Sequence, residues 1–164
     1  MGKKSRRANK IPLPQKGQIV AAPSTLYSKV SRLLAASKFD EVSALEEQYR
    51  HLHIFCIDPF KDVFILHSFG NVIMNKEEDW GPAISYLERS RDLIVNNPDE
   101  DFQAQFPNLT QGIELELAIC YSEFHDVEKS IAAYRWVLEN SEREYVQTEY
   151  RHICHLGRNF IKFK

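Results

Sequence analysis

The sequence predicts an all-α protein in which about seven helices stack as antiparallel pairs. Three observations predict this class. Apolar residues recur at helical spacing from residue 24 onward, short turns join the stretches into pairs, and one spacing of large and small residues returns in each pair. No stretch alternates apolar and polar residues between turn residues, so we expect little or no β-sheet.

The composition is that of an ordinary globular domain. The 164 residues are 43% hydrophobic and 27% charged, and this length suits one domain with its own core. No apolar run is as long as a membrane span, and no signal-peptide core follows the first residues. Three widely spaced cysteines, Cys56, Cys120 and Cys154, fit a reducing compartment. We therefore expect a cytoplasmic or nuclear protein that does not interact with membranes.

Two regions differ in character: residues 1–23 predict a disordered basic arm, and residues 24–164 predict a helical-repeat domain. The arm mixes prolines with basic residues and has no helical period. Up to residue 17 it has no acidic residue, so the rest of the chain is more acidic than the net charge of −2 suggests. The arm is a candidate import signal or RNA tether, or only a solvated tail. The candidate residues are Lys3, Lys4, Arg6, Arg7 and Lys10.

The first four predicted helices form two pairs. Ser24 or Thr25 can cap a helix that carries its apolar residues between 26 and 34, and a break at Ser37-Lys38 follows it. A second helix is expected from Phe39 to about Phe55, where Asp58-Pro59 stops it. The next pair is expected at 60–75 and from Asp79, the predicted N-cap, to about residue 97.

The remaining helices follow the longest predicted loop, residues 97–110, which contains two prolines and an acidic run. Two amphipathic helices joined by a short turn are expected between Gln111 and Asn140. A last helix is expected from about Glu144 to Phe163, with apolar residues at helical spacing.

An internal repeat relates the pairs to one another. Each second helix opens with a bulky apolar residue and has a smaller residue three positions later; the instances are Phe39/Val42, Trp80/Ala83 and Val127/Ser130. The first helices carry the spacings Val30/Leu33, Gly70/Ile73 and Ala118/Tyr121, and the last predicted helix has Gly157 and Phe160. A small residue lets the partner helix approach closely, and a pair that cannot cover its own apolar face must stack on its neighbours.

The motifs Phe69-Gly70-x-x-Ile73, Leu156-Gly157-x-x-Phe160 and Asp79-Trp80-x-x-Ala83-x-x-x-Leu87 resemble the tetratricopeptide repeat (TPR) family, over about residues 24–163. The resemblance implies a right-handed α-solenoid whose first helices line a concave groove. Three features depart from the family pattern. One extra residue separates Gly70 from Ala83, Glu46 replaces an apolar residue, and residues 97–110 are an insertion.

The resemblance also suggests where a partner would bind. One branch of the family binds a C-terminal carboxylate, but here His67 replaces an expected Lys and Glu116 places an acid where Asn is needed. Because that acid would repel the ligand, the sequence disfavours a carboxylate clamp. The candidate partner-binding residues on the first helices are His67, Asn71, Met74, Glu114, Glu116 and Arg151.

Catalysis and metal binding have little support in the sequence. It contains no Gly-rich phosphate loop, no G-x-S-x-G and no H-E-x-x-H, so we expect neither an enzyme nor a cofactor. Two clusters have metal-ligand residue types but no C-x-x-C, and we expect no metal site; they are His51, His53 and Cys56, and His152, Cys154 and His155.

The predicted function is that of a non-enzymatic scaffold that binds a partner peptide or helix in the repeat groove. The alternative is an RNA-associated or nuclear or nucleolar factor that acts through the basic arm. A third hypothesis is that the chain is a module of a longer protein, since Ile161 and Phe163 place apolar residues in the last predicted helix.

Overall fold

A computed structural model describes residues 19–21, 25–50, 53–55, 58–76 and 78–140, which are predominantly helical, as predicted. They form seven α-helices and two strands of three residues each. The helices are α1 (Leu26–Ala35), α2 (Phe39–Glu47), α3 (Pro59–Lys76), α4 (Trp80–Val95), α5 (Glu100–Gln103), α6 (Pro107–Glu123) and α7 (Val127–Asn140). The strands are β1 (Ile19–Ala21) and β2 (His53–Phe55).

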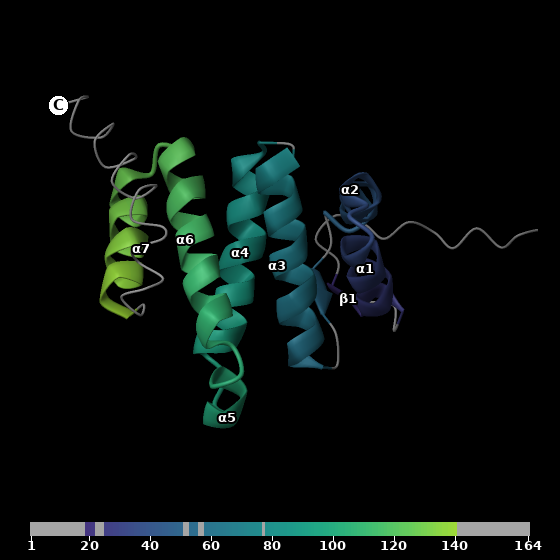
Figure 1. Ribbon diagram of the computed structural model, residues 1–164, viewed down its shortest axis with the longest axis horizontal. Helices are drawn as coiled ribbons and strands as arrows, with labels where there is room; N and C mark the ends of the chain where they lie inside the picture. The colour runs from purple at the N-terminus through teal and green to yellow at the C-terminus, as the bar shows by residue number, and fades with distance from the viewer. Residues whose placement is uncertain (1–18, 22–24, 51–52, 56–57, 77, 141–164) are drawn as a thin grey trace, which may run out of the picture.

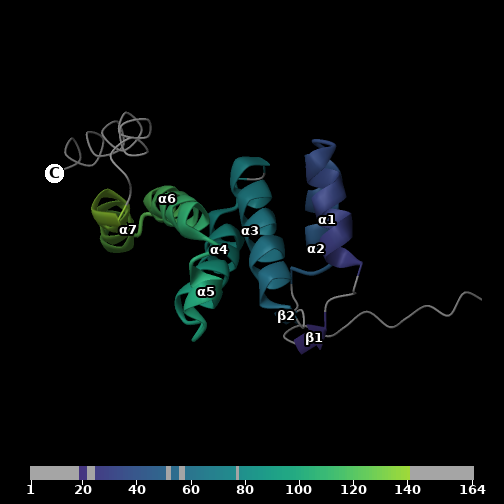
Figure 2. The same ribbon diagram turned by 60° about the horizontal axis from the view of Figure 1, so that its bottom comes forward.

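The long helices form three pairs that follow one another across the molecule: α1 with α2, α3 with α4, and α6 with α7 (Figure 1). The helix α4 packs against both α3 and α6, and it thereby joins the second pair to the third. The single-turn helix α5 projects below α4 and α6, whereas β1 and β2 lie near the start of α3 (Figure 2).

The turn inside each pair has the same backbone conformation. Ser37, Glu78 and His125 have positive φ angles of 54°, 52° and 64°, and each stands two residues before its second helix. At the end of α6, Asp126 N donates to Tyr121 O at 2.8 Å and His125 N donates to Ser122 O at 3.1 Å. This is the Schellman arrangement, which satisfies the last carbonyl groups of a helix. The end of α1 repeats it with Lys38 N to Leu33 O and Ser37 N to Leu34 O, both at 2.9 Å.

Small residues allow the helices of a pair to approach closely, as the repeat pattern predicts. A Cβ atom on Gly70 would lie 2.8 Å from Leu87 Cγ and 3.3 Å from the Ala83 carbonyl oxygen. In the third pair, Ser130 Oγ donates to the Ala118 carbonyl oxygen at 2.9 Å. The interfaces at Gly70/Ala83 and Ala118/Ser130 therefore use the same positions of the repeat.

A continuous hydrophobic core runs through all three pairs, and aromatic packing contributes to it between α3 and α4. The rings of Phe69 and Tyr86 meet edge to face with centroids 5.7 Å apart. Six fully buried side chains come from six different helices: Val30, Val42, Ile73, Leu87, Leu117 and Val137. The core is thus distributed along the stack and is not confined to one pair.

Glu46 is the acidic residue that breaks the apolar pattern of α2, and its side chain is completely buried. Its carboxylate accepts hydrogen bonds from Arg50 Nη2 at 2.8 Å and from the Tyr86 hydroxyl at 2.9 Å. Arg50 Nη1 lies 3.5 Å from Asp79 Oδ2. The cluster of Glu46, Arg50 and Tyr86 therefore connects α2 to α4.

Asp79 precedes α4, as predicted for an N-cap, but its side chain accepts no capping hydrogen bond.

Two predicted boundaries at the start of the chain are wrong. The helix expected from Phe39 to Phe55 ends at Glu47, because Tyr49 N and Arg50 N both donate to the Glu46 carbonyl oxygen and turn the chain. Residues His53–Phe55 then pair in parallel with Ile19–Ala21, a segment that the sequence assigns to the disordered arm. Strand pairing satisfies the backbone groups of apolar and β-branched residues such as Ile19 and Ile54.

The predicted loop 97–110 also contains helices. Asp99 caps α5 by accepting from Asp101 N at 3.0 Å and from Phe102 N at 3.3 Å. The next helix, α6, begins at Pro107, a residue tolerated in the first turn because its missing N–H would have no helical partner. The predicted helix 144–163 lies outside the described residues.

We expect the Gly70→Ala variant to be less stable than the wild type by about 1–3 kcal/mol, because the added methyl group would overlap Leu87. Gly112→Ala is the matched control: a Cβ there meets nothing within 4 Å, so this variant should gain about 0.5–1 kcal/mol of helix propensity. Urea denaturation followed by circular dichroism measures both. Equal effects of the two substitutions would contradict the close approach.

We expect Glu46→Ala to lower the free energy of unfolding by about 3–5 kcal/mol, because it leaves the partly buried Arg50 without its main partner. The control is Glu41→Ala, which removes the exposed ion pair with Lys38 and should change stability by less than about 1 kcal/mol. The same denaturation experiment compares them. A loss as small for Glu46 as for Glu41 would show that the buried group does not join the pairs.

Candidate functional site

Two groups of aromatic side chains lie next to each other across α1, α3, α5 and the start of α6. We call them the aromatic belt, and its members are Tyr27 and Phe64 in one group and Phe60, Phe106 and Phe102 in the other. The ring centroids are 5.0 Å apart for Tyr27 and Phe64, 5.3 Å for Phe60 and Phe106, and 5.0 Å for Phe102 and Phe106. Phe60 and Phe64 lie one helical turn apart on the same side of α3, which places the two groups side by side. The belt therefore spans elements from all three helix pairs.

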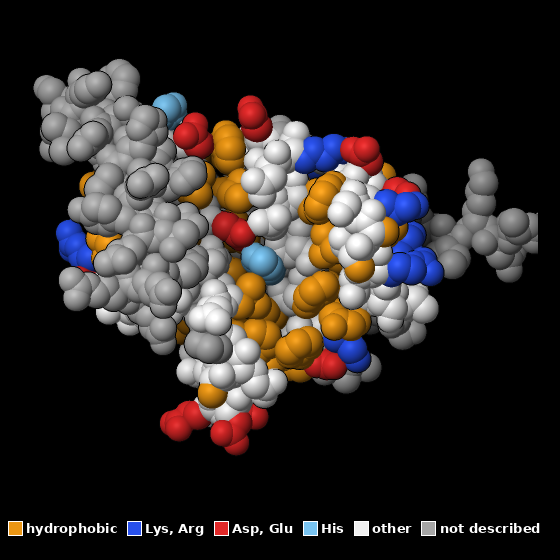
Figure 3. All heavy atoms as spheres, viewed as in Figure 1, with side chains coloured by type: hydrophobic (Ala, Val, Ile, Leu, Met, Phe, Trp, Pro, Cys, Tyr) orange, Lys and Arg blue, Asp and Glu red, His pale blue; other side chains and the backbone are white. Residues whose placement is uncertain are grey.

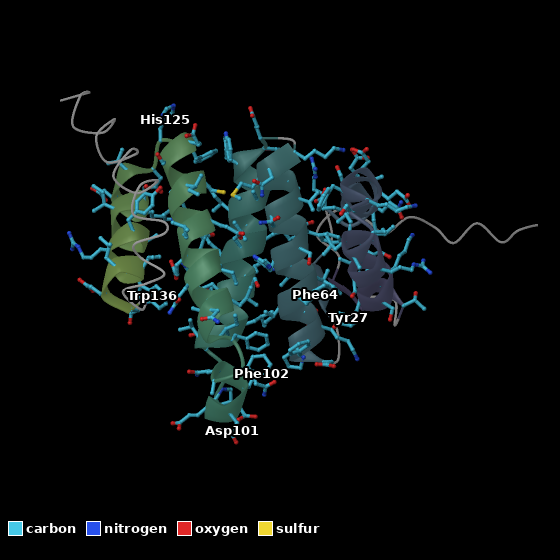
Figure 4. All side chains as sticks on the ribbon, in the orientation of Figure 1. Tyr27, Phe64, Asp101, Phe102, His125 and Trp136 are labelled. Carbon is cyan, nitrogen blue, oxygen red and sulfur yellow. The ribbon has the colours of Figure 1, made fainter. Side chains whose placement is uncertain are left out.

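The belt is only partly covered. Phe106 is buried, Tyr27, Phe64 and Phe102 are half-buried, and 40% of Phe60 is exposed. Hydrophobic side chains gather on the face between α6 and α3 (Figure 3). The labelled Tyr27, Phe64 and Phe102 lie along this same face (Figure 4). Aromatic residues that remain accessible on a well-packed frame are typical of protein-binding surfaces.

A polar cluster joins α3 to α6 on the same face. The Glu116 carboxylate accepts from Asn71 Nδ2 at 2.6 Å, and His67 Nε2 lies 3.0 Å from its other oxygen. Figure 3 shows a histidine beside a carboxylate near the middle of this face. The positions that would hold a partner's carboxylate in the resembled family branch thus contact a carboxylate of the same chain.

The predicted partner-binding residues do not all meet. His67, Asn71 and Glu116 come together, as just described. Met74 is buried in the core, with 8% of its surface exposed, so it is not placed to contact a partner. Glu114 faces away from Glu116, because residues two apart on a helix point in different directions.

Glu114 instead lines a cleft of about 490 Å³ between α4, α6 and α7. Burial raises the pKa of its carboxyl, and its nearest cation is Arg91, whose Nε lies 3.7 Å away. In the same cleft, Tyr121 donates to Glu88 at 2.6 Å, and Lys129 lies over the Tyr121 ring. The acidic and basic side chains of this cleft are therefore largely paired with one another.

A second cleft, of about 670 Å³, lies between the start of α2 and the C-terminal half of α3. Its two lysines are engaged, since Lys38 pairs with Glu41 at 2.5 Å and Lys76 pairs with Asp40. This matching of charges leaves the cleft without a distinctive chemical character.

The belt was not predicted, although part of its signal is in the sequence. Phe60 and Phe64 have helical spacing at the start of α3, but Phe102 and Phe106 belong to the stretch read as an insertion. Only the folded chain brings Phe106, at the start of α6, against Phe60 and places Phe102 of α5 beside Phe106.

The last described helix, α7, exposes an apolar strip formed by Val127, Ile131 and Leu138. Counted from the first residue of each helix, Ile131 and Leu138 correspond to Ile84 and Arg91 of α4. Ile84 is partly buried against the core and Arg91 faces Glu114 of α6. The strip on α7 is therefore the equivalent of the α4 side that faces the next pair.

Several predicted residues lie outside the part of the chain whose side chains are described. These are Arg151, the arm residues Lys3, Lys4, Arg6, Arg7 and Lys10, and the histidines and cysteines considered as metal ligands. Among the side chains that are described, no three His, Cys, Asp or Glu residues are grouped to hold a metal ion. None of the described helices is both long enough and apolar enough to span a membrane.

No protein-family model, no curated protein and no solved structure matches this chain.

We expect the Cys120 thiol to resist alkylation in the folded protein, because burial raises its pKa from about 9 to about 12. As pH rises between these values, the unfolded chain loses this proton first, so the contribution of Cys120 to stability falls. Iodoacetamide labelling at pH 9 is compared without urea and in about 8 M urea, which unfolds the protein. Peptide mass spectrometry reads the extent of labelling. Equal labelling rates would contradict the burial.

Proposed function

We propose that this protein is a non-enzymatic interaction scaffold that binds a peptide or helix of a partner protein on the aromatic belt. We also propose that its helix pairs form a right-handed, TPR-like α-solenoid. The repeated turn conformation at Ser37, Glu78 and His125 supports this second proposal, as does the close approach at Gly70. Both features are expected of a stack built from one repeated unit.

The observation that carries the proposed function is the accessible belt itself. Five aromatic side chains from α1, α3, α5 and the start of α6 lie on one face, and Phe60 remains 40% exposed between Phe64 and Phe106. Exposing such rings to water is unfavourable, and covering them with apolar side chains of a partner would release that free energy. The helices beneath the belt are packed, so little conformational freedom would be lost when a partner binds.

The reactive groups with described side chains support a role in binding and not in catalysis. His67 is engaged by Glu116. Cys120 is buried, and burial raises its pKa far above neutrality, which leaves the thiol protonated. The Cys120 thiol is therefore not available as a nucleophile in the folded protein.

We expect full-length protein to enrich binding peptides from a random 16-residue display library, where roughly four helical turns suffice to cover the belt. The variant Phe60→Ser should lose this enrichment, because it removes the exposed centre of the belt. Phe124→Ser is the matched control: Phe124 is 59% exposed but lies at the other end of α6, so enrichment should persist.

Sequencing of the selected pools reads the result. A wild-type pool no richer than that of Phe60→Ser would overturn the proposed function. Loss of enrichment in Phe124→Ser alone would move the binding surface away from the belt.

A further inference from the structure

We infer that the partner segment on the aromatic belt is cationic and amphipathic, with large apolar side chains on one side and Lys or Arg beside them. This inference rests on the proposed function, because it names the chemistry of the partner that the same belt would bind. Its basis is the charge that surrounds the belt.

The belt ends against acidic groups on α5. Phe102, its last ring, follows directly after Asp99, Glu100 and Asp101, all of which are exposed. Asp99 is engaged as the N-cap of α5, so Glu100 and Asp101 are the carboxylates available to an incoming group. Within the described ranges, neither of these two residues forms an ion pair with a basic side chain. The labelled Asp101 lies at the tip of α5, just beyond Phe102 (Figure 4).

The basic residue next to Phe60 in the chain is already paired. This residue, Lys61, lies 3.0 Å from the carboxylate of Asp58, so that pair is neutral. Glu116, whose side chain joins α6 to α3, is also acidic, and it contacts the ring of His67 and the amide of Asn71. Among the described side chains, the α5 end of the belt is therefore negative, and Lys61 beside Phe60 is matched by Asp58.

A partner segment must match both properties. Apolar side chains would cover Phe60 and Phe102, and a basic residue one turn beyond would reach Glu100 and Asp101. An acidic segment would bring like charges together, which disfavours it even when its apolar side chains fit. Complementary charge thus selects among the peptides that the belt could bind.

The test uses two synthetic 16-residue helical peptides with the same leucine and phenylalanine stripe. One carries lysine and the other glutamate at the remaining positions. Affinity for the full-length protein is measured by fluorescence anisotropy. We expect the lysine peptide to bind at least about tenfold more tightly, and to lose about tenfold in affinity to the double variant Glu100→Lys/Asp101→Lys.

The control Glu128→Lys/Glu139→Lys makes the same change in net charge at exposed positions on α7, and it should leave the affinity unchanged. Binding of both peptides with equal affinity would overturn the inference, and so would equal losses in the two double variants. If library peptides bind but the lysine peptide does not, the inference fails while the proposed function stands. If nothing binds, both fail.

The chain's own basic arm is the competing occupant of the belt. One further variant tests whether the arm binds there. In the full-length protein, Lys3, Lys4, Arg6, Arg7 and Lys10 are replaced by Gln. Unchanged affinity for the lysine peptide supports an external partner. An affinity that rises tenfold or so, as expected when an internal competitor is released, would assign the belt to the arm and overturn the inference.

Discussion

The buried carboxylate of Glu46 is the interaction on which the joint between the first two helix pairs depends. A charge removed from water is costly unless hydrogen bonds and an opposite charge replace its hydration. Arg50 supplies the charge from the same turn of chain, and Tyr86 supplies a hydroxyl from α4. Because the second donor comes from another pair, the carboxylate is satisfied only when the two pairs are correctly placed. An apolar residue would pack there without that directional requirement.

Local steric patterns in the sequence predict the packing within pairs, whereas the contacts between distant segments are beyond them. Gly70 and Ala83 could be matched because a small residue has a direct consequence for the helix beside it. In the sequence, Glu46 is only a departure from the apolar pattern of its helix. Its contact with Tyr86 is not predicted, because the two residues are 40 positions apart. Glu114 and Glu116 are predicted to line one groove, but helical geometry alone points residues two apart in different directions. The aromatic belt is not predicted, because Phe106 and Phe60 of α3 are far apart in the sequence and meet only in the folded chain.

The belt and the core make opposite use of the same residue types. Phe69 and Tyr86 face each other between α3 and α4 and are withdrawn from water. Phe60, at the start of the same helix, meets Phe106 at the start of α6 and remains 40% exposed. One helix therefore serves two purposes along its length: its middle stabilises the fold, and its first turns present a surface. The polar link from His67 and Asn71 to Glu116 joins the middle of α3 to α6.

The exposed strip on α7 shows how such an architecture can change during evolution. In α4 the corresponding side meets the following pair, and α7 retains apolar residues in that place. Each unit thus carries the means of joining another of its kind. Duplication of one coding segment would add a pair without redesign of those already present, and it would extend the outward face in proportion. A pair added in this way would cover the apolar side of α7.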